Sequence, residues 1–334
     1  MLSLPKRPLT ELTKLTQYEK AWQQMQPFLL ENGYELRRRY QPGWVHSWSD
    51  GTWPESGWPE DSIVAKAKYF VDAVRSRTGE RVGLKLVKLD EEIGVQELEI
   101  HEYLQQDTVR NDPRNPCIPL LEILHPPTHP NQCLLVMPLL YDILSPAFQH
   151  ASECVEFVGQ LLRGMEFLHE HNIAHKDICL HNVVMTAPGL YPKGCHPMNN
   201  SLSEDGLTYS EKKTRREVNP KYYFIDFGLS IKYGTPNERK ETRIFRGMCR
   251  SVPEYERSGP WDGFKIDVYC MGILIHEEVV KGHIKMHFLK PLIKKMTRID
   301  PSRRPTAQQA VVDFNRYISG FNLGRTVRSV LPFL

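Results

Sequence analysis

Two short segments carry oxygen-bearing side chains at spacings that suit phosphoryl transfer. In HKDICLHN, residues 175–182, Asp177 and Asn182 lie in a loop between an amphipathic helical run and the apolar VVM. Further along, Asp226 ends the apolar run YYFI and is followed closely by Gly228. Phosphoryl transfer needs a carboxylate that orients the attacking hydroxyl and oxygen ligands that hold Mg²⁺ against the phosphates. Asp177 suits the first role, and Asn182 and Asp226 suit the second.

A third segment, VGLK, supplies a cation. Lys85 lies in an alternating run whose apolar residues point to the opposite face of a predicted strand. A lysine fixed on a strand can hold the α- and β-phosphates of a nucleotide, and it then needs a carboxylate to orient it. We assign that carboxylate to Glu97 in the following helical run, with Glu99 as the close alternative.

The elements that must position these residues fall into two parts. Residues 63–88 alternate as strands do, with RSRTGE as a turn, and GVQELEIHEYLQQ follows as a helix. After a Pro-rich loop, LLEIL and CLLVMPLL complete a small β-rich lobe. From residue 151 the pattern becomes helical, first in SECVEFVGQLLRGMEFLHEH and again around 265–281 and 305–318.

Two stretches depart from this order. Residues 188–220 are rich in Pro, Gly, Asn and Ser. We interpret them either as a solvent-exposed loop inserted into the fold or as a segment that binds acidic partners or is modified. Residues 1–61 hold five of the six Trp. This lead-in is either a docking surface for a partner or an extension packed on its own domain by buried aromatic rings.

Composition limits the class of protein. The chain has 334 residues, 40% of them hydrophobic, with 43 Lys and Arg against 40 Asp and Glu. A globular fold is expected, and no bulk charge favours nucleic acid. No apolar run is long enough to span a membrane, and the first residues lack a secretory pattern. The seven Cys are scattered, as in proteins with reduced thiols, so we expect a cytoplasmic or nuclear protein.

The order of the motifs resembles the eukaryotic protein kinase fold over roughly residues 62–318. The matching set is Lys85 in VGLK, Glu97, HKDICLHN, DFG at 226–228, VPE at 252–254, Asp267 in DVYCMG and Arg304 in DPSRRPT. The resemblance implies an α+β, bilobal fold with a small β-rich N-lobe, one main helix in it, and a larger, mainly α-helical C-lobe. YYFIDFGLS, LYPKGCHP and GYELRRRYQPGW are also similar to a divergent group of fungal (basidiomycete) kinase-domain proteins.

The resemblance also implies domain limits and two structural roles. Asp267 would brace the catalytic loop, and Glu254 would pair with Arg304 inside the large lobe. The implied parts are a Trp-rich N-terminal extension (1–61), an N-lobe and hinge (62–142), a C-lobe (143–320) with an insertion at about 188–220, and a C-terminal tail (321–334).

With ATP and Mg²⁺ as the implied cofactors, the resemblance gives each charged site residue a role. Asp177 would be the catalytic base, and Asn182 and Asp226 would hold the metal. Lys85, paired with Glu97, would hold the nucleotide phosphates.

The resemblance extends to the apolar part of the nucleotide site. Met137 falls at the gatekeeper position. The hinge after it would bind adenine through the Pro138 carbonyl and the Leu140 N–H. Val71 and Val184 complete the implied nucleotide-binding set.

The chain departs from the family pattern at three points. When Val71 is aligned with the valine of the family's Gly-rich loop, Val64, Lys66 and Tyr69 fall at the positions of the three glycines. Side chains at those positions keep the backbone from closing over phosphates. Lys176 stands where the family usually has an Arg. A lysine keeps the positive charge but lacks the two parallel N–H donors with which an arginine binds a phosphate in the activation loop. Cys179 stands where Ser/Thr kinases have a Lys that steadies the γ-phosphate.

Three functions fit these residues. The intact charged set favours an active Ser/Thr-type protein kinase that transfers the γ-phosphoryl group of Mg-ATP to a protein hydroxyl. The absent glycines and Cys179 favour a pseudokinase scaffold that still binds nucleotide. A small-molecule kinase is the third, and VPE together with Arg304 argues against it. The sequence names no protein substrate.

Overall fold

The computed structural model describes residues 9–65, 67–186, 188–242 and 245–320. They form two units, each discontinuous in sequence. The described residues of the first unit lie within 1–90, 119–145 and 188–218, and those of the second within 91–118, 146–187 and 219–334. Strands dominate the first unit and helices the second, which is the mixed α+β class that the sequence predicts. Lys66 and the expected tail 321–334 lie outside the described residues.

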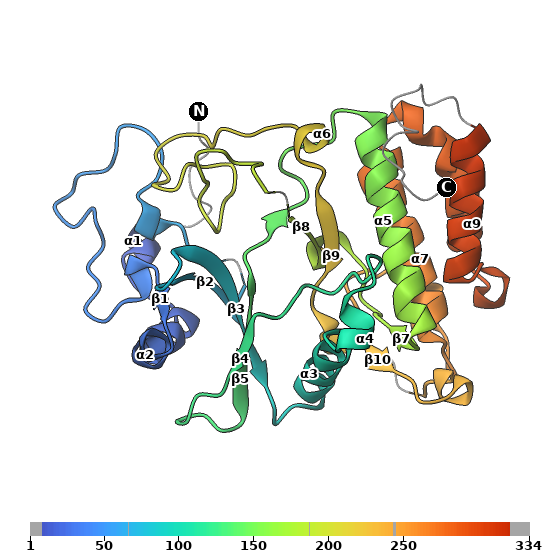
Figure 1. The fold of residues 1–334 in the computed structure, drawn as a ribbon, viewed down its shortest axis with the longest axis horizontal. Helices are drawn as coiled ribbons and strands as arrows, with labels where there is room; N and C mark the ends of the chain where they lie inside the picture. Colours follow the sequence, from blue (N-terminus) through green and yellow to red (C-terminus); the bar gives the residue numbers. More distant parts are fainter. Residues whose placement is uncertain (1–8, 66, 187, 243–244, 321–334) are drawn as a thin grey trace. The chain divides into compact units, whose positions relative to one another are not determined.

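An antiparallel sheet forms the framework of the first unit (Figure 1). Its strand order is β1-β2-β3-β5-β4, with β1 (Tyr34–Leu36), β2 (Phe70–Arg75), β3 (Glu80–Lys88), β4 (Glu122–Leu124) and β5 (Gln132–Pro138). Lys85 lies opposite Phe70 of β2 and Leu135 of β5. Because paired residues share a face and neighbours along a strand do not, Lys85 points away from the face that carries Leu84.

The first strand lies within residues 1–61, for which the sequence predicts an N-terminal extension. β1 pairs with β2 from Tyr34 opposite Arg75 to Leu36 opposite Ala73. The Trp-rich stretch 37–69 therefore connects β1 to β2. The strand expected from residue 63 begins only at Phe70. A strand of three residues shows too little alternation to be recognised in the sequence.

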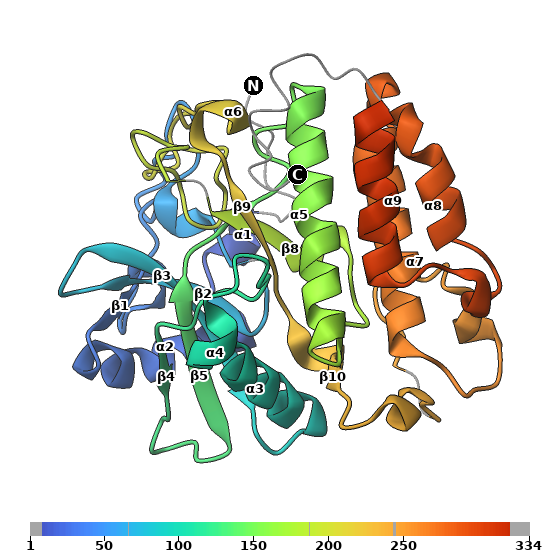
Figure 2. The same cartoon turned by 45° about the vertical axis from the view of Figure 1, so that its right-hand side comes forward.

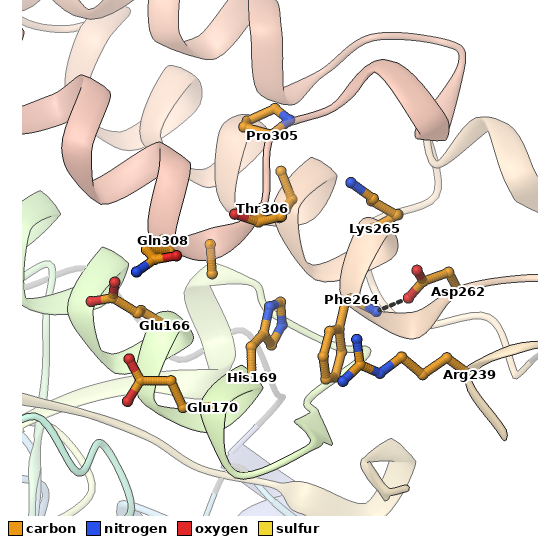
Figure 3. A pocket seen from close by; sticks show the side chains of 12 residues that line it. Glu166, His169, Glu170, Arg239, Asp262, Phe264, Lys265, Pro305, Thr306 and Gln308 are labelled. Atoms are coloured by element: carbon orange, nitrogen blue, oxygen red, sulfur yellow. Dashed lines mark hydrogen bonds between the residues drawn. The ribbon is translucent and has the colours of Figure 1, made fainter. Parts of the chain in front are cut away.

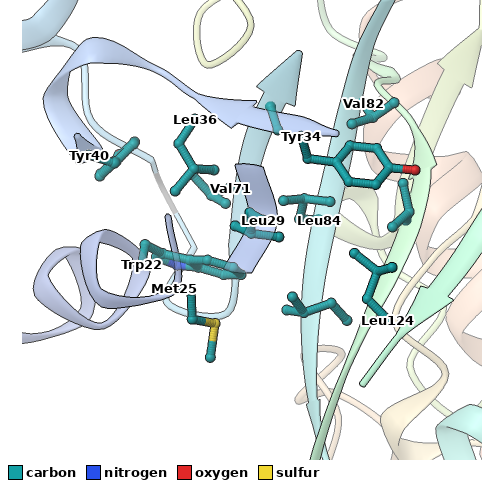
Figure 4. Packing of buried hydrophobic residues seen from close by; sticks show 13 residues of the cluster. Trp22, Met25, Leu29, Tyr34, Leu36, Tyr40, Val71, Val82, Leu84 and Leu124 are labelled. Atoms are coloured by element: carbon teal, nitrogen blue, oxygen red, sulfur yellow. The ribbon is translucent and has the colours of Figure 1, made fainter. Parts of the chain in front are cut away.

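Helix α2 (Gln17–Glu31) packs against β1 and supplies much of this unit's core. It begins with a capping box, in which the Glu19 N–H donates to Thr16 Oγ1 at 3.3 Å and the Thr16 N–H donates to Glu19 Oε2 at 2.8 Å. α2 continues through Pro27, although an interior proline costs about 3 kcal/mol. Burial of large apolar side chains, each contributing about 1.5–3 kcal/mol, offsets that cost. The cluster comprises Trp22, Met25, Leu29, Tyr34, Leu36, Tyr40, Val71, Ala73, Val82, Leu84, Leu124, Leu134 and Val136 (Figure 4).

Residues 188–218, which are most of the expected insertion 188–220, pack within the same unit. The Trp58 N–H donates to the Gly206 carbonyl at 2.9 Å, and His196 Nε2 lies 3.4 Å from Arg37 Nη1. Gly206 has φ +78°, and a Cβ there would lie 2.3 Å from the Trp58 carbonyl oxygen, so only glycine permits this approach. The unit is completed by α1 (Leu9–Leu12), β6 (Tyr141–Asp142) and α6 (Arg215–Val218).

The second unit is built around α5 (Ala151–Glu170), which packs along α7 (Gly263–Ile275) and α9 (Ala307–Gly320) (Figure 2). The apolar face predicted for α5 is buried, from Val155 to Leu168. α8 (Lys290–Met296), which packs on α7 and α9, has no counterpart in the sequence analysis. The remaining α-helices and strands of this unit are α3 (Glu92–Leu104), α4 (Asp107–Arg110), β7 (Ile173–Ala174), β8 (Val183–Thr186), β9 (Lys221–Phe224) and β10 (Ile231–Lys232).

Two short antiparallel pairs in this unit, β7 with β10 and β8 with β9, flank the loops that carry the motif residues. Among the helices of the described ranges, none combines the length and apolar character that a membrane span requires.

Candidate active site

The loop 175–182, between β7 and β8, is fixed by a buried carboxylate on α7. Asp267 Oδ2 accepts the His175 N–H at 2.8 Å, and Oδ1 accepts the Lys176 N–H at 2.6 Å. His169 Nε2 lies 3.0 Å from Asp267 Oδ2. Asp267 is fully buried, and Lys176 has φ 65°, a strained conformation for a residue with a side chain. These bonds hold the loop in place and confirm the bracing role predicted for Asp267.

Asp177 and Asn182 meet within this loop. Asn182 Nδ2 donates to Asp177 Oδ2 at 3.0 Å and to the Asp177 carbonyl at 3.0 Å. The second oxygen, Asp177 Oδ1, accepts the Met248 N–H at 2.6 Å. Because both oxygens of Asp177 are held, the carboxylate has a defined orientation.

Asp226 follows β9 and lies next to the same loop through the backbone. The Ile225 N–H donates to the Asn182 carbonyl at 3.0 Å. Asp226 itself has φ 65°. A Cβ on Gly228 would lie 3.4 Å from Asp226 Oδ1 and 4.0 Å from Glu97 Oε2, so both carboxylates flank this glycine.

Burial is the main influence on the titration of the loop. It raises the pKa of Asp177, and the negative charge of Asp226 acts in the same direction, while the Met248 N–H opposes the rise. Burial, aided by the Asp177 charge, also raises the pKa of Cys179 to about 11. Cys179 is therefore a neutral thiol at physiological pH and brings no charge to the site.

The donor atoms fit Mg²⁺ as a cofactor shared with phosphate. Asn182 uses its amide nitrogen toward Asp177, so its amide oxygen is the atom that would bind a metal, and Asp226 would add a carboxylate oxygen. Across the described ranges, no group of three or more His, Cys, Asp and Glu side chains is placed to hold a metal. Mg²⁺ held by one or two protein oxygens takes its other ligands from phosphate and water.

A buried ion pair anchors the segment after β10 to the loop. Lys176 Nζ lies 2.5 Å from Glu241 Oε2, and both side chains are less than 10% exposed. The Tyr233 hydroxyl donates to the other oxygen of Glu241. Glu241 and Trp261 also exchange backbone hydrogen bonds of 2.9 and 3.0 Å. The sequence did not indicate Glu241, because nothing local distinguishes it from a solvent-exposed glutamate.

The predicted pair of Glu254 and Arg304 is confirmed. Arg304 Nη1 and Nη2 donate to the two oxygens of Glu254 at 2.6 and 2.7 Å, and both residues are buried. This bidentate geometry is the strong form of an arginine–carboxylate contact.

Burial distinguishes the two candidate glutamates of α3. Glu97 is buried and Glu99 is exposed. His101 Nε2 lies 3.9 Å from Glu97 Oε1, and the His101 ring contacts Phe227. Glu97 therefore faces the segment that contains Asp226. Lys85 belongs to the first unit and Glu97 to the second, so their pairing stays a prediction.

Val71 lies on the wrong face of the sheet for a nucleotide contact. It pairs with Leu84 and is fully buried in the core cluster with α2 (Figure 4). Since neighbouring strand residues point to opposite faces, Lys85 points away from it. The prediction for Val71 is therefore wrong, and Phe70, which pairs with Lys85, lies on the Lys85 face instead.

The other nucleotide-site predictions remain open. Met137 pairs with Gly83 and so shares the face of Lys85, and Pro138 ends β5. Leu140 follows β5 in the first unit. Val184 is half-buried on β8 in the second unit. Their contacts with a nucleotide stay predictions.

A pocket of about 300 Å³ opens beside α5, α7 and the start of α9 (Figure 3). Phe264 lies between His169, stacked on it at 4.0 Å between ring centroids, and the Arg239 guanidinium, 4.3 Å from the ring centre. None of the motif residues 175–182 and 226–228 lines it. Through His169 it adjoins Asp267 and hence the loop.

The family model that matches this sequence is described as Protein tyrosine and serine/threonine kinase, and the match covers residues 95–313. A curated relative with a similar sequence is the serine/threonine-protein kinase CAK1 of Saccharomyces cerevisiae. It is 23% identical over 225 residues, which are 64% of this chain and 49% of the relative. The chain thus spans about half the length of that relative.

Proposed function

We propose that this chain, which belongs to the protein tyrosine and serine/threonine kinase family, is an active kinase that transfers the γ-phosphoryl group of ATP to a protein hydroxyl. The observation that carries the proposal is the Asp177 carboxylate. It is fixed by Asn182 on one oxygen and by the Met248 N–H on the other. A carboxylate held in this way suits the orientation of an attacking hydroxyl.

In this proposal Mg²⁺ neutralises the charge that develops on the transferred phosphoryl group. Asn182 and Asp226 bind the metal, and Asp177 orients the substrate hydroxyl and accepts its proton. Lys85, oriented by Glu97, binds the nucleotide phosphates. Phosphoryl transfer depends chiefly on positioning and electrostatics, so the rigid bracing of the loop by Asp267 contributes directly to the rate.

We propose Ser or Thr as the acceptor. The support is the similarity to a serine/threonine-protein kinase, which covers 64% of this chain. The buried Trp22, Trp48 and Trp58 pack within the first unit, which favours a structural role for the Trp-rich segment over partner docking.

A pseudokinase that binds nucleotide without transfer is the second candidate. Two observations favour it. Cys179 brings no charge where the family has a lysine, and a Cβ on Gly83 would lie 2.6 Å from the Phe70 ring, so this ring covers the strand beside Lys85. Adenine would have to stack on the Phe70 ring or displace it.

An assay with labelled ATP distinguishes the active kinase from the pseudokinase. The full chain is incubated with Mg²⁺ and a mixture of protein acceptors, once with γ-labelled and once with α-labelled ATP, and again with EDTA in place of Mg²⁺. We expect label on protein only from γ-labelled ATP with Mg²⁺, and on Ser or Thr after hydrolysis of the product. An ATP-induced rise in melting temperature without any transfer would instead identify the pseudokinase.

A further inference from the structure

A basic groove of about 550 Å³ is lined by the end of α8, the turn after it and the first turns of α9. The two helices pack against each other in the second unit (Figure 2). The charged residues that line the groove are Lys295, Arg298, Arg303, Arg304, Arg316 and Asp313. We propose that this groove is a docking site for an acidic segment of a partner protein, rich in Asp and Glu. The inference does not rest on the proposed function, because none of the described residues that line the groove belongs to the loop 175–182 or to 226–228.

Asp313 is the one carboxylate among the described residues that line the groove, and two cations share it. Lys295 Nζ lies 2.7 Å from Asp313 Oδ2, and Arg316 Nη1 lies 3.0 Å from Asp313 Oδ1. Arg304 is already neutralised by its buried pair with Glu254. One carboxylate compensates only one of two cations, so this end of the groove stays positive.

Arg298 and Arg303 add positive charge at the other end, where both are exposed. Arg298 Nη1 donates to the Arg303 carbonyl at 2.6 Å, which is a neutral acceptor. The neighbouring carboxylate of Asp300 accepts the Ser302 N–H and hydroxyl at 3.0 and 2.7 Å. Even with Asp300 and Glu254 counted, five cations face three carboxylates, an excess of two positive charges. That excess is local, because the whole chain of 334 residues has a net charge of only +3.

The spacing of the cations suits several separate carboxylates. Arg298 and Arg303 lie in the turn before α9, whereas Arg316 lies far along the helix. From Gln309, in the first turn of α9, to Arg316 is seven residues, which is about 10 Å along the axis. An extended peptide advances about 3.3 Å per residue, so about three residues span that length. A segment with acidic residues at intervals can therefore reach both ends of the groove, which a single small anion cannot.

The remaining lining favours a peptide over a nucleic acid. None of the described lining residues is aromatic, so nucleic-acid bases would have no ring on which to stack. Val312 lies in the groove with 52% of its surface exposed, and it offers an apolar contact to a side chain. Gln308 is also exposed there, and its amide can hydrogen-bond a peptide backbone.

The turn that carries Arg298 and Arg303 is held in place by Arg304. Arg304 Nε donates to the Arg298 carbonyl at 2.7 Å, and Arg304 Nη1 donates to the Lys265 carbonyl at 2.8 Å. The Arg304 side chain itself is fully buried. Because this wall is already ordered, a bound peptide would have little of it to immobilise, which favours binding.

The test uses fluorescence anisotropy of a labelled peptide of alternating Glu and Ala residues, titrated with the full chain. We expect saturable binding that weakens as salt is raised, because exposed charges are screened. The double variant Arg303→Glu/Arg316→Glu should weaken binding about tenfold or more, since attractive pairs become repulsive. A peptide of alternating Lys and Ala should show the reverse order and bind the double variant better than the wild type.

The matched control is Arg110→Glu on α4. Like Arg316, Arg110 is exposed and pairs with an aspartate three residues earlier, but it lies outside the groove. Its reversal should change the affinity by less than about twofold. Each variant is checked for an unchanged melting temperature, and Arg303→Ala/Arg316→Ala replaces the reversed pair if that pair lowers it.

Three results would overturn the inference. The first is no saturable binding of the Glu–Ala peptide by the wild type at low salt. The second is an equal loss of affinity in the double variant and in Arg110→Glu, which would place the binding elsewhere. The third is tighter binding of a single-stranded oligothymidylate than of the peptide, which would identify a nucleic-acid site. The assay contains no ATP, so none of these results depends on whether the chain transfers phosphate.

Discussion

Burial favours the protonated form of Asp177, whereas the proposed function requires its carboxylate form. Burial raises its pKa and the charge of Asp226 adds to the rise, yet a base that orients a hydroxyl must be ionised. The Met248 N–H and Asn182 amide oppose the rise by hydrogen-bonding the charged form. Asp177 thus becomes protonated at a higher pH than an exposed aspartate.

The first prediction is the pH dependence of transfer. As pH falls, Asp177 takes up a proton and activity is lost, and because its pKa is raised, this loss begins above the range of an ordinary aspartate. The measurement is the initial rate of labelled phosphate transfer from pH 4 to pH 8, with melting temperature followed in parallel. A rate that stays constant down to the pH where the fold is lost would contradict the assignment.

The second prediction concerns the Glu254–Arg304 pair. Glu254→Gln removes one charge of a buried bidentate pair and leaves Arg304 uncompensated, so unfolding should become easier by about 3–5 kcal/mol. Urea denaturation measures it. The matched control is Glu277→Gln, whose partner Lys281 is exposed, and it should leave stability unchanged within error. Equal effects of the two changes would argue against a structural role for the buried pair.

At this scale the sequence predicts residue types better than side-chain directions. Asp177, Asn182, Asp267 and Arg304 could be recognised because their chemistry and order are distinctive. Val71 was misplaced because a shift of one position turns a strand residue to the other face, and a short alternating run leaves that register undefined.

Among the elements, the segment 245–255 has the most direct effect on the site. Its glycine at 247 lies against Asp177, and Glu254 near its C-terminal end is held by Arg304.

The third prediction follows from that contact. In Gly247→Ala the new Cβ would lie 2.5 Å from Asp177 Oδ1 and 2.9 Å from the Lys176 carbonyl, so the segment must move away. Transfer should fall on the order of 10²-fold, as when a reacting group is displaced by about 1 Å. ATP affinity should change little. The control is Gly282→Ala, where a Cβ would meet nothing within 4 Å. If both variants retain the wild-type rate, Gly247 does not position Asp177.

The sequence predicts the long helices and strands better than the short ones. The amphipathic pattern from residue 151 gives α5 almost residue for residue, because six apolar positions at helical spacing leave no alternative. β1 and α8 were missed because three and seven residues carry too little periodicity.

On the scale of the whole molecule, the N-terminal segment is part of the core. Trp22, Leu29 and Tyr34 pack against Val71 and Leu84 of the sheet. The stretch 188–218 belongs to the same unit, although residues 146–187 of the second unit separate it from the preceding part of the first. No sequence pattern could assign it there, because its Pro- and Gly-rich composition is also typical of solvated loops.

The fourth prediction tests the N-terminal core with adjacent residues of α2. Leu29 is fully buried, and Leu30 is 53% exposed. Leu29→Ala should destabilise the chain by about 2–5 kcal/mol, because it removes transfer free energy and leaves a cavity. Leu30→Ala should have a small effect. Thermal denaturation of the two full-length variants compares them. Similar melting temperatures would mean that α2 does not pack as described.

The measurement that tests the central claim most directly compares ATP binding and transfer in two variants. Asp177→Asn should bind Mg-ATP nearly as tightly as the wild type and transfer phosphate about 10²- to 10⁴-fold more slowly, since only the base is lost. Asp226→Asn should lose the Mg²⁺ dependence of binding as well as transfer. Asp107→Asn, on the exposed surface of α4, is the control and should match the wild type in both. Transfer at the wild-type rate by Asp177→Asn would contradict the account.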